Sequence, residues 1–201
     1  MSGRLTIVGA HMPAHAEELP LLYPVTTEIP KEDAAYRDAI RDFYDRSAAA
    51  VAKHLNAGRT VAILSEGDPL FYGSYMHLHV RLSTRYPTEV IAGVTGMSGC
   101  WSSIGLPMTQ GDDVFTVLPG TLPEYELERR LADAQAAVVM KIGRHLAKVR
   151  RALDRAGCLD RAIYVERGTM ANASVRKLTD KLDGDAPYFA IVLVPGWEQR
   201  E

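Results

Sequence analysis

Two glycine-containing turns that follow short apolar runs are the stretches of this sequence best suited to hold a small ligand. The first, Ser65-Glu-Gly-Asp-Pro-Leu-Phe-Tyr-Gly73, comes directly after Val61–Leu64, and a short apolar run before a turn is typical of a buried parallel strand. Gly67 lets the backbone turn sharply or a ligand approach closely, and open α/β sheets bind ligands at the carboxyl ends of their strands. A capped turn without a ligand explains the same residues, with Asp68 capping the next helix and Pro69 at its first position.

The second turn, Gly93-Val-Thr-Gly-Met-Ser-Gly-Cys100, follows a predicted strand at Thr88–Ala92. Its glycines favour a helix start, and the main-chain N–H groups there can cradle the polar end of a ligand. Ser98 is not a nucleophile elbow, because that motif needs a glycine two residues after the serine and position 100 is Cys. The two turns therefore indicate binding by main-chain groups rather than covalent catalysis.

Composition narrows the class of protein. The 201 residues are 47% hydrophobic and 24% charged, with a net charge of -2, which predicts an ordinary globular protein and argues against nucleic-acid or membrane-surface partners. No apolar run is long enough to span a membrane, and the N-terminus lacks the pattern of a signal peptide. Cys100 and Cys158 are too few for a disulfide framework or a zinc site. His77 and His79 point to different helix faces, so we expect no metal and a reducing cytoplasm.

The elements that must position the turns alternate between strand and helix, which predicts an α/β fold with a mostly parallel N-terminal sheet. A helix is expected from about Pro30 to Gly58. Its apolar stripe is Tyr36, Ile40, Phe43, Ser47, Val51 and Leu55. Turn-forming residues at 105–113 predict a boundary between two domains, 1–110 and 111–201.

The second domain is expected to contain a mixed sheet with one or more antiparallel strands near the end. A capping box at Thr121-Leu-Pro-Glu124 predicts the start of its first helix. The predicted strands are 114–118, 136–142, 161–166 and 187–194, and the predicted helices are 121–132 and 145–156.

The first turn resembles the Gly-Asp-Pro-x-x-Tyr-Gly motif of the tetrapyrrole methyltransferases. Longer stretches narrow the resemblance to the members that methylate precorrin-2 in cobalamin biosynthesis, and it runs from about Glu18 to Trp197. These stretches are Leu19–Glu28, Glu66–Met76, Gly93–Cys100 and Tyr164–Thr169. The resemblance implies a two-domain fold, S-adenosylmethionine as methyl donor, precorrin-2 as acceptor and a homodimer.

The resemblance also implies a donor site made of four strand ends. These are the Gly-Asp-Pro motif with the aromatic residue after it, the Thr-Gly pair of the second turn, the end of the strand at 136–142, and the Gly-Thr turn after the strand at 161–166. The implied donor-binding residues are Gly67, Asp68, Pro69, Tyr72, Thr95, Gly96, Met140, Ile142, Arg167, Gly168 and Thr169. Main-chain N–H and C=O groups there can form hydrogen bonds with the adenine and the ribose, while apolar side chains pack against the adenine ring. The residues identify no proton acceptor.

The implied acceptor carries eight carboxylates, which calls for basic side chains near the cleft. Arg144 and Lys148 are the candidates, because they share a helix face if the helix begins early enough. A solvated basic face explains the same residues. Two other functions stay open: the same fold acting on another acceptor, and a product that binds the donor without turnover or does not fold stably.

The beginning of the sequence departs from the family pattern. Those enzymes open with a strand, a Gly-x-Gly-x-Gly-Asp loop, a helix and a second strand. Here Leu5–Val8 has the composition of a short strand, but Val8-Gly-Ala-His-Met-Pro13 contains no such loop. We therefore expect the first βα unit to be missing, through an internal start codon or a genuine deletion. The missing strand would lie inside a parallel sheet, so its loss should leave unpaired main-chain groups and exposed apolar surface.

Overall fold

The computed structural model describes residues 9–24 and 33–196, and the chain forms two compact units, Met1–Val94 and Thr95–Glu201. The division differs from the predicted domains 1–110 and 111–201 because α4, Gly96–Ser103, belongs to the second unit. Its Cys100 is buried in one cluster with Val138 and Val165 of the second unit's sheet.

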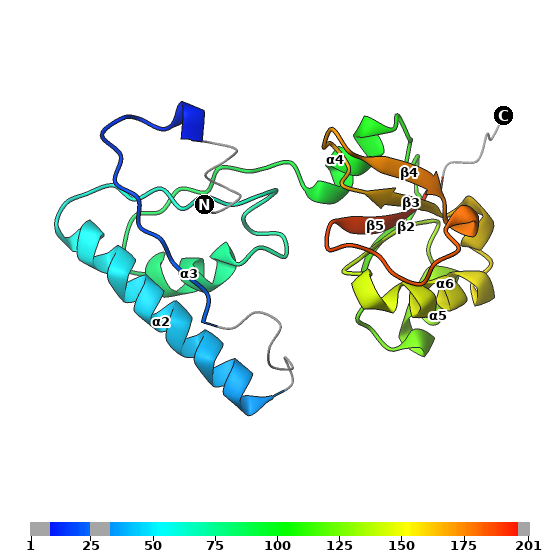
Figure 1. Cartoon of the computed structure of the whole chain (residues 1–201), viewed down its shortest axis with the longest axis horizontal. Helices are drawn as coiled ribbons and strands as arrows, with labels where there is room; N and C mark the ends of the chain where they lie inside the picture. Colours follow the sequence, from blue (N-terminus) through cyan, green and yellow to red (C-terminus); the bar gives the residue numbers. More distant parts are fainter. Residues whose placement is uncertain (1–8, 25–32, 197–201) are drawn as a thin grey trace. The chain divides into compact units, whose positions relative to one another are not determined.

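The first unit contains a short 3₁₀ helix, η1, at Gly9–His11 and two α-helices, α2 at Ala34–Asn56 and α3 at Tyr75–Leu82 (Figure 1). The Asp33 side chain caps α2 by accepting a hydrogen bond from Ala35 N at 2.8 Å. Pro30, where this helix was predicted to begin, lies outside the described residues.

The core of the first unit lies between α2 and α3. The predicted stripe of α2 is confirmed at its centre, because Phe43, Ser47 and Val51 are buried. Phe43 and Val51 pack in one cluster with Leu78 and Leu82 of α3. Burial of these apolar side chains is what holds the two helices together.

The strand predictions for Thr60–Leu64 and Thr88–Ala92 are wrong, because neither segment is a β-strand in the structure. Half-buried Val61 and Ile63 alternate with exposed Ala62 and Leu64, which is the two-residue period of an extended chain. In the described part of this unit, however, no main-chain hydrogen bond joins the two segments. A strand exists only with a partner for its N–H and C=O groups, so the predicted parallel sheet of the first unit is absent from the residues that the structure describes.

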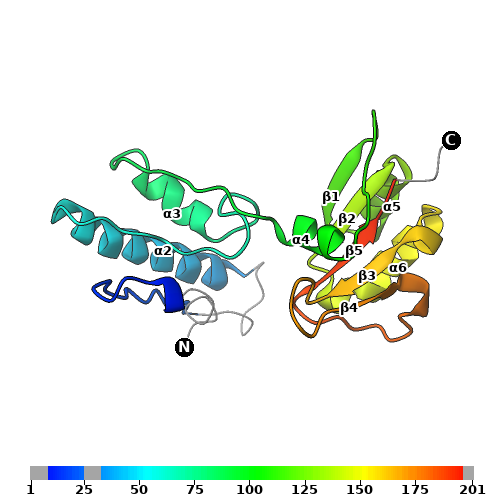
Figure 2. The same ribbon diagram turned by 90° about the horizontal axis from the view of Figure 1, so that it is seen from above.

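The second unit contains a mixed sheet, as predicted, and the sheet has five strands where four were predicted (Figure 2). Its strands are β1 at Phe115–Pro119, β2 at Ala136–Met140, β3 at Ile163–Glu166, β4 at Ser174–Lys177 and β5 at Ala190–Val194. The spatial order is β1-β2-β5-β3-β4. β1 and β2 are parallel, whereas β5 runs antiparallel to both of its neighbours and β4 is antiparallel to β3.

Helices cover both faces of this sheet. On one face, Val139 and Val192 pack in a cluster that includes α5, Glu124–Ala132, and α6, Leu146–Arg155. On the other face, their neighbours Val138 and Leu193 pack in a cluster that includes α4. The short 3₁₀ helices η2, η3 and η4 lie at Gly143–His145, Leu159–Arg161 and Leu178–Asp180. β2 is apolar along its whole length because helices cover both faces of the sheet and bury the side chains on each side of the strand.

Two predicted helix caps are wrong. The N-cap of α5 is Pro123, which cannot donate or accept through its side chain, and Glu124 instead pairs with Arg151 at 2.6 Å. Asp68 does not cap α3, because that helix begins at Tyr75 after Ser74. In both places the predicted capping residue, Thr121 or Asp68, lies further before the helix than the actual N-cap residue.

Replacing Leu153 tests the packing of α6. Leu153 is fully buried in the core of the second unit, and Leu153→Ala should lower the free energy of unfolding by roughly 2–5 kcal/mol, because the cavity collapses only partly. Urea unfolding followed by circular dichroism measures the change. The control is Asp154→Ala, exposed on the same helix, which should change stability by less than ~0.5 kcal/mol. Equal effects of the two variants would contradict this packing.

Candidate functional site

The insertion of β5 between β2 and β3 brings two of the predicted patches to one edge of the sheet. β5 is antiparallel to both strands, so β2 and β3 run in the same direction. Their carboxyl ends therefore meet at the edge where β5 begins at Ala190. The turn at Arg167–Thr169 follows β3 there, and Arg167 N donates to Phe189 O at 2.8 Å. Met140 and Ile142 lie at the end of β2 on the same edge.

Close packing brings the start of α4 to the same turn. A Cβ added at Gly168 would lie 2.3 Å from Cys100 Sγ, and one added at Gly99 would lie 3.1 Å from Thr169 Cγ2. Only glycine allows so close an approach between a helix and a turn. Burial raises the pKa of the Cys100 thiol, so this sulfur stays protonated and serves as packing.

Thr95 and Gly96 begin this helix. Thr95 is the N-cap of α4, and its Oγ1 accepts a hydrogen bond from Ser98 N at 3.3 Å. Ser98 Oγ donates back to Thr95 O at 2.9 Å, a local bond that agrees with rejecting Ser98 as a nucleophile. In the second unit, the structure thus places Thr95 and Gly96 on the helix that packs against the Arg167–Thr169 turn.

The ends of β1 and β2 form a further close contact that the sequence prediction missed. Gly120 N donates to Met140 O at 2.6 Å, and a Cβ at Gly120 would lie 3.2 Å from Lys141 O. Met140 is half-buried, but the Ile142 side chain is fully buried in the core. Ile142 therefore offers a ligand its main chain and not its side chain. The available signal for Gly120 was a glycine two residues after the predicted strand 114–118.

Backbone strain coincides with the predicted patches in both units. Among the described residues, the non-glycine residues with positive φ are Tyr72 (53°), Lys141 (57°), Arg167 (48°) and Thr169 (72°). Tyr72, Arg167 and Thr169 are predicted donor-binding residues, and Lys141 lies in the chain between two others, Met140 and Ile142. A positive φ is uncommon for residues that carry a Cβ, costs of order 1–3 kcal/mol, and clusters at functional sites. The side chain types gave no signal of this strain.

In the first unit, the Asp68 carboxylate fixes the Gly-Asp-Pro turn. Asp68 Oδ1 accepts from Leu70 N at 2.9 Å, and Oδ2 accepts from Gly93 N at 3.1 Å. Gly67 has a φ of 72°, and a Cβ added at Gly93 would lie 2.1 Å from Gly67 O. Asp68 is therefore a positioning residue, while Pro69 is half-buried and Tyr72 is 45% exposed.

The predicted shared helix face of Arg144 and Lys148 is wrong, because α6 begins only at Leu146 and Arg144 lies in η2. The Lys148 amine donates to Leu122 O, and desolvation lowers its pKa, although Glu124 opposes this. Arg144 is exposed. Lys148 thus holds the loop after β1, and Arg144 is the better placed of the two for an acidic ligand.

Neighbouring basic residues also have structural roles. Arg150 donates to the main-chain carbonyls of Thr179 and Lys181, and Arg151 pairs with Glu124. Burial, followed by the charges of Lys148 and Arg144, lowers the pKa of His145. Lys148, Arg150 and Arg151 therefore hold loops and a helix start of the second unit in place.

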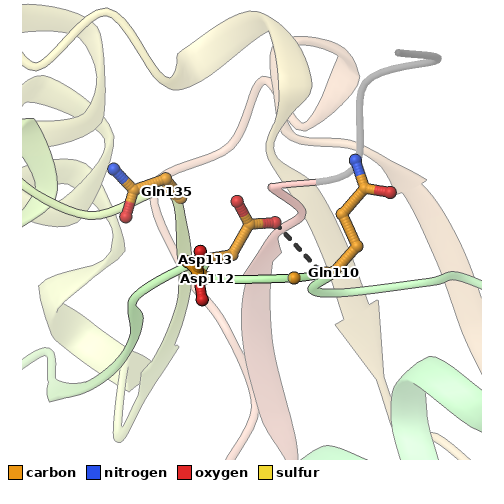
Figure 3. A pocket seen from close by; sticks show the side chains of 5 residues that line it. Gln110, Asp112, Asp113 and Gln135 are labelled. Atoms are coloured by element: carbon orange, nitrogen blue, oxygen red, sulfur yellow. Dashed lines mark hydrogen bonds between the residues drawn. The ribbon is translucent and has the colours of Figure 1, made fainter. Parts of the chain in front are cut away.

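A separate cavity of about 420 Å³ lies before β1 and β2, at the edge opposite the predicted site (Figure 3). It is lined by Gln110, Gly111, Asp112, Asp113 and Gln135. Two of these lining residues are hydrogen-bonded, with Asp113 Oδ2 accepting from Gln110 N at 3.0 Å. No predicted site residue lines this cavity, and the amino ends of parallel strands are not where α/β sheets bind ligands.

The described residues contain no group of three or more His, Cys, Asp and Glu side chains that could hold a metal ion. Within the same residues, no helix has the length and apolar character needed to cross a membrane.

Comparison with known proteins gives two informative relatives. The chain is 65% identical over 199 residues to a precorrin-2 C(20)-methyltransferase of Sinorhizobium sp, a match that covers 99% of this chain and 81% of that protein. It is 48% identical over 180 residues to the cobalamin biosynthesis protein CobIJ of Mycobacterium tuberculosis. That match covers 90% of this chain but spans only 35% of the longer relative.

Solved structures share the fold. A cobalt precorrin-4 methyltransferase superposes with a TM-score of 0.63 at 19% identity, over 76% of this chain and 70% of that chain. A uroporphyrin-III C-methyltransferase from Thermus thermophilus, complexed with S-adenosylhomocysteine, gives 0.55 at 22% identity, over 74% and 72%. The sequence profile of the tetrapyrrole (corrin/porphyrin) methylases matches residues 4–182. The α/β architecture, the profile and the 65% identical relative agree, and the chain belongs to the tetrapyrrole (corrin/porphyrin) methylase family.

Proposed function

We propose that this chain is an S-adenosylmethionine-dependent C-methyltransferase that converts precorrin-2 to precorrin-3A in cobalamin biosynthesis. The observation that carries the proposal is the coincidence of strained or close-packed backbone with the positions implied for the donor. Arg167, Gly168 and Thr169 form such a turn beside the end of β2, and Gly67 and Asp68 form another in the first unit. The acceptor is proposed from the 65% identical relative, whose printed name is precorrin-2 C(20)-methyltransferase.

The residues present suit a nucleoside with an amino-acid tail. At the carboxyl edge of the second unit's sheet, turns after β2 and β3 and the start of α4 present main-chain N–H and C=O groups, and half-buried Met140 supplies apolar surface. Main-chain groups bind adenine edges and ribose hydroxyls without the rotamer entropy of long side chains. The Thr169 hydroxyl is exposed at the same turn. Bound S-adenosylmethionine supplies the electrophilic methyl group.

The role of the chain in this reaction is positioning and not covalent chemistry. Holding two reactants at near-attack distance can contribute roughly 7–11 kcal/mol to lowering a barrier. Glycines at 93, 99 and 168 set the backbone contacts that fix the turns, and Arg144 is the proposed contact for an acceptor carboxylate.

Calorimetric titration of the full chain with S-adenosylhomocysteine is the first test. We expect saturable binding of one molecule per chain, followed by transfer of one methyl group to precorrin-2, measured by mass spectrometry of the tetrapyrrole. If the chain binds the donor but methylates a different tetrapyrrole, the proposed donor site is supported and the proposed acceptor, precorrin-2, is wrong. A folded chain that binds no donor would overturn the proposed function.

Gly168→Ala tests the contact between α4 and the turn after β3. The new methyl group would meet Cys100 Sγ at 2.3 Å, and such overpacking costs typically ~1–3 kcal/mol. We expect the turn to shift and the dissociation constant of S-adenosylhomocysteine, measured by titration, to rise at least about tenfold, equivalent to ~1.4 kcal/mol.

Two variants make this test specific. Gly184→Ala is the matched control, because a Cβ there meets nothing within 4 Å, and donor binding should stay unchanged. Adding Cys100→Ala to Gly168→Ala removes the clashing sulfur and should restore part of the affinity. If Gly168→Ala binds the donor as tightly as the parent, this turn is not part of the site.

Asp68→Ala tests the turn in the first unit. The substitution leaves Leu70 N and Gly93 N without their acceptor, and we expect donor affinity to fall about tenfold, equivalent to ~1.4 kcal/mol. Thermal unfolding measured alongside should show that the second unit is unaffected. Glu66→Ala, exposed two residues earlier, is the control. Unchanged affinity in Asp68→Ala would remove this turn from the proposed site.

We also propose a cytoplasmic homodimer. Exposed apolar side chains before β5 support an interface, with Leu182 at 89% and Tyr188 at 90% exposure, since large exposed apolar groups in one loop favour association. Sedimentation velocity should give twice the chain mass. A monomer at micromolar concentration would contradict the dimer while leaving the donor site untouched.

A further inference from the structure

A hydrogen-bonded pair of side chains lies on β3, directly before the turn at Arg167–Thr169. Tyr164 is fully buried in the cluster that includes α5 and α6, and Glu166, two residues along the strand, lies on the same face. The Tyr164 hydroxyl donates to Glu166 Oε1 at 2.7 Å, and a hydrogen bond to a carboxylate is stronger than one between neutral groups. The Glu166 side chain is therefore fixed at the last position of β3, and only 14% of it is exposed.

The core keeps the Tyr164 hydroxyl in place as a donor. Burial first, and then the hydrogen bond and charge of Glu166, raise the pKa of Tyr164. Its ring is also held from the side, because Lys181 Nζ lies 5.1 Å from the ring centroid and Lys181 is itself buried and paired with Asp183. Tyr164 is therefore a neutral donor whose position is set by the core of the second unit and not by the turn.

Glu166 lies next to guanidinium groups from two strands. Arg167 Nη1 is 3.6 Å from Glu166 Oε2. On β4, Ser174 is the residue paired with Glu166, and Arg176 Nη2 donates to Ser174 Oγ at 2.9 Å. Paired residues of adjacent strands lie on the same face, so this bond brings the Arg176 guanidinium to the position opposite Glu166. Glu166 thus supplies negative charge where two positive side chains gather.

The charge of this turn bears on the ligand proposed to bind there. S-adenosylmethionine has a positively charged sulfonium, and transfer of its methyl group leaves the neutral thioether of S-adenosylhomocysteine. An unpaired guanidinium at the turn would repel the sulfonium and leave the thioether unaffected. It would therefore weaken binding of the donor while the product stayed bound. A carboxylate that pairs with the guanidinium counters this repulsion.

We propose that Glu166 is a positioning residue that acts through Arg167: held by Tyr164, it keeps the Arg167 guanidinium paired and so favours the sulfonium donor over its thioether product. The inference rests on the proposed function. The Arg167 main chain is fixed independently, since Arg167 N donates to Phe189 O at 2.8 Å. Glu166 therefore directs the side chain of Arg167, while β5 holds its backbone.

Glu166→Gln tests the charge, because glutamine still offers Tyr164 an acceptor oxygen but carries no charge. Calorimetric titration of the full chain gives the dissociation constants of S-adenosylmethionine and S-adenosylhomocysteine. The ratio of the first to the second should rise at least about threefold in the variant at low salt. It should return toward the parent's ratio near 1 M salt, where the Debye length is only about 3 Å. A merely structural role would weaken both ligands alike and leave the ratio unchanged.

Three further variants make the test specific. Adding Arg167→Gln to Glu166→Gln removes the unpaired guanidinium and should bring the ratio back toward that of the parent. Tyr164→Phe keeps the ring and the carboxylate but releases Glu166, and should raise the ratio less than Glu166→Gln. Asp154→Asn is the matched control: it removes one exposed negative charge from α6, and that helix starts after the carboxyl end of β2 and is about 15 Å long, so Asp154 lies toward the opposite edge of the sheet.

A readout without ligand separates charge from folding. Exchange of the Arg167 amide hydrogen, which is bonded to Phe189 O, should be the same in the parent and in Glu166→Gln. Faster exchange in the variant, with both ligands weakened equally, would give Glu166 a structural role and overturn the proposal.

The remaining outcomes distinguish this inference from the proposed function. If the parent binds both ligands and Glu166→Gln keeps the parent's ratio, the inference is wrong and the proposed function stands. If the ratio rises and Arg167→Gln does not reverse the rise, the assignment to Arg167 is overturned. A folded parent that binds neither ligand would overturn the proposed function and this inference together.

Discussion

The second unit depends on the insertion of its last strand between two strands that precede it in sequence. β5 forms ladders with both β2 and β3, and it is antiparallel to each. Without it, the two strands would have no common edge at which their carboxyl ends meet. The interaction is made of main-chain hydrogen bonds in a sheet that is covered on both faces, where an unpaired group would be costly. The position of the candidate site is therefore a consequence of the topology of the sheet.

At that edge, the chain uses close backbone contacts in place of reactive side chains. Gly168 lies against Cys100, Gly99 against Thr169, and Gly120 against Lys141. The positive φ angles of Arg167 and Thr169 raise the conformational free energy of the folded backbone, and contacts in the surrounding structure must offset this strain. Methyl transfer needs reactants that are held in place and shielded from water, and it needs no nucleophile from the protein. A site built from fixed main-chain groups suits that requirement.

The elements predicted correctly from the sequence are those with a local pattern of apolar residues and with a neighbouring strand or helix to pair with or pack against. The mixed sheet, α6 and the stripe of α2 follow from apolar periodicity, which reports burial directly. β4 was missed because Ser174–Lys177 is an edge strand that is largely exposed and contains two basic residues. The cap at Thr121 failed because Pro123 sets the start of α5. Positive φ at Lys141 or Tyr72 leaves no trace in residue type, since both side chains are ordinary in other conformations.

The two units differ in what completes their sheets, and the difference explains why similar sequence patterns gave different structures. Ala136–Val139 of β2 is buried residue by residue, because β1 and β5 pair with it and helices cover both faces. Val61–Leu64 has much the same composition, yet alternate residues are exposed and its main chain is unpaired in the described structure. An apolar segment therefore has a tendency to be buried in a sheet. It becomes a strand only when a neighbouring strand pairs with its main chain. The Gly67–Asp68 turn follows this unpaired segment and is joined to Gly93 by a single side-chain hydrogen bond and one close backbone approach, so this part of the candidate site is held by turn contacts and not by the ladder of a sheet.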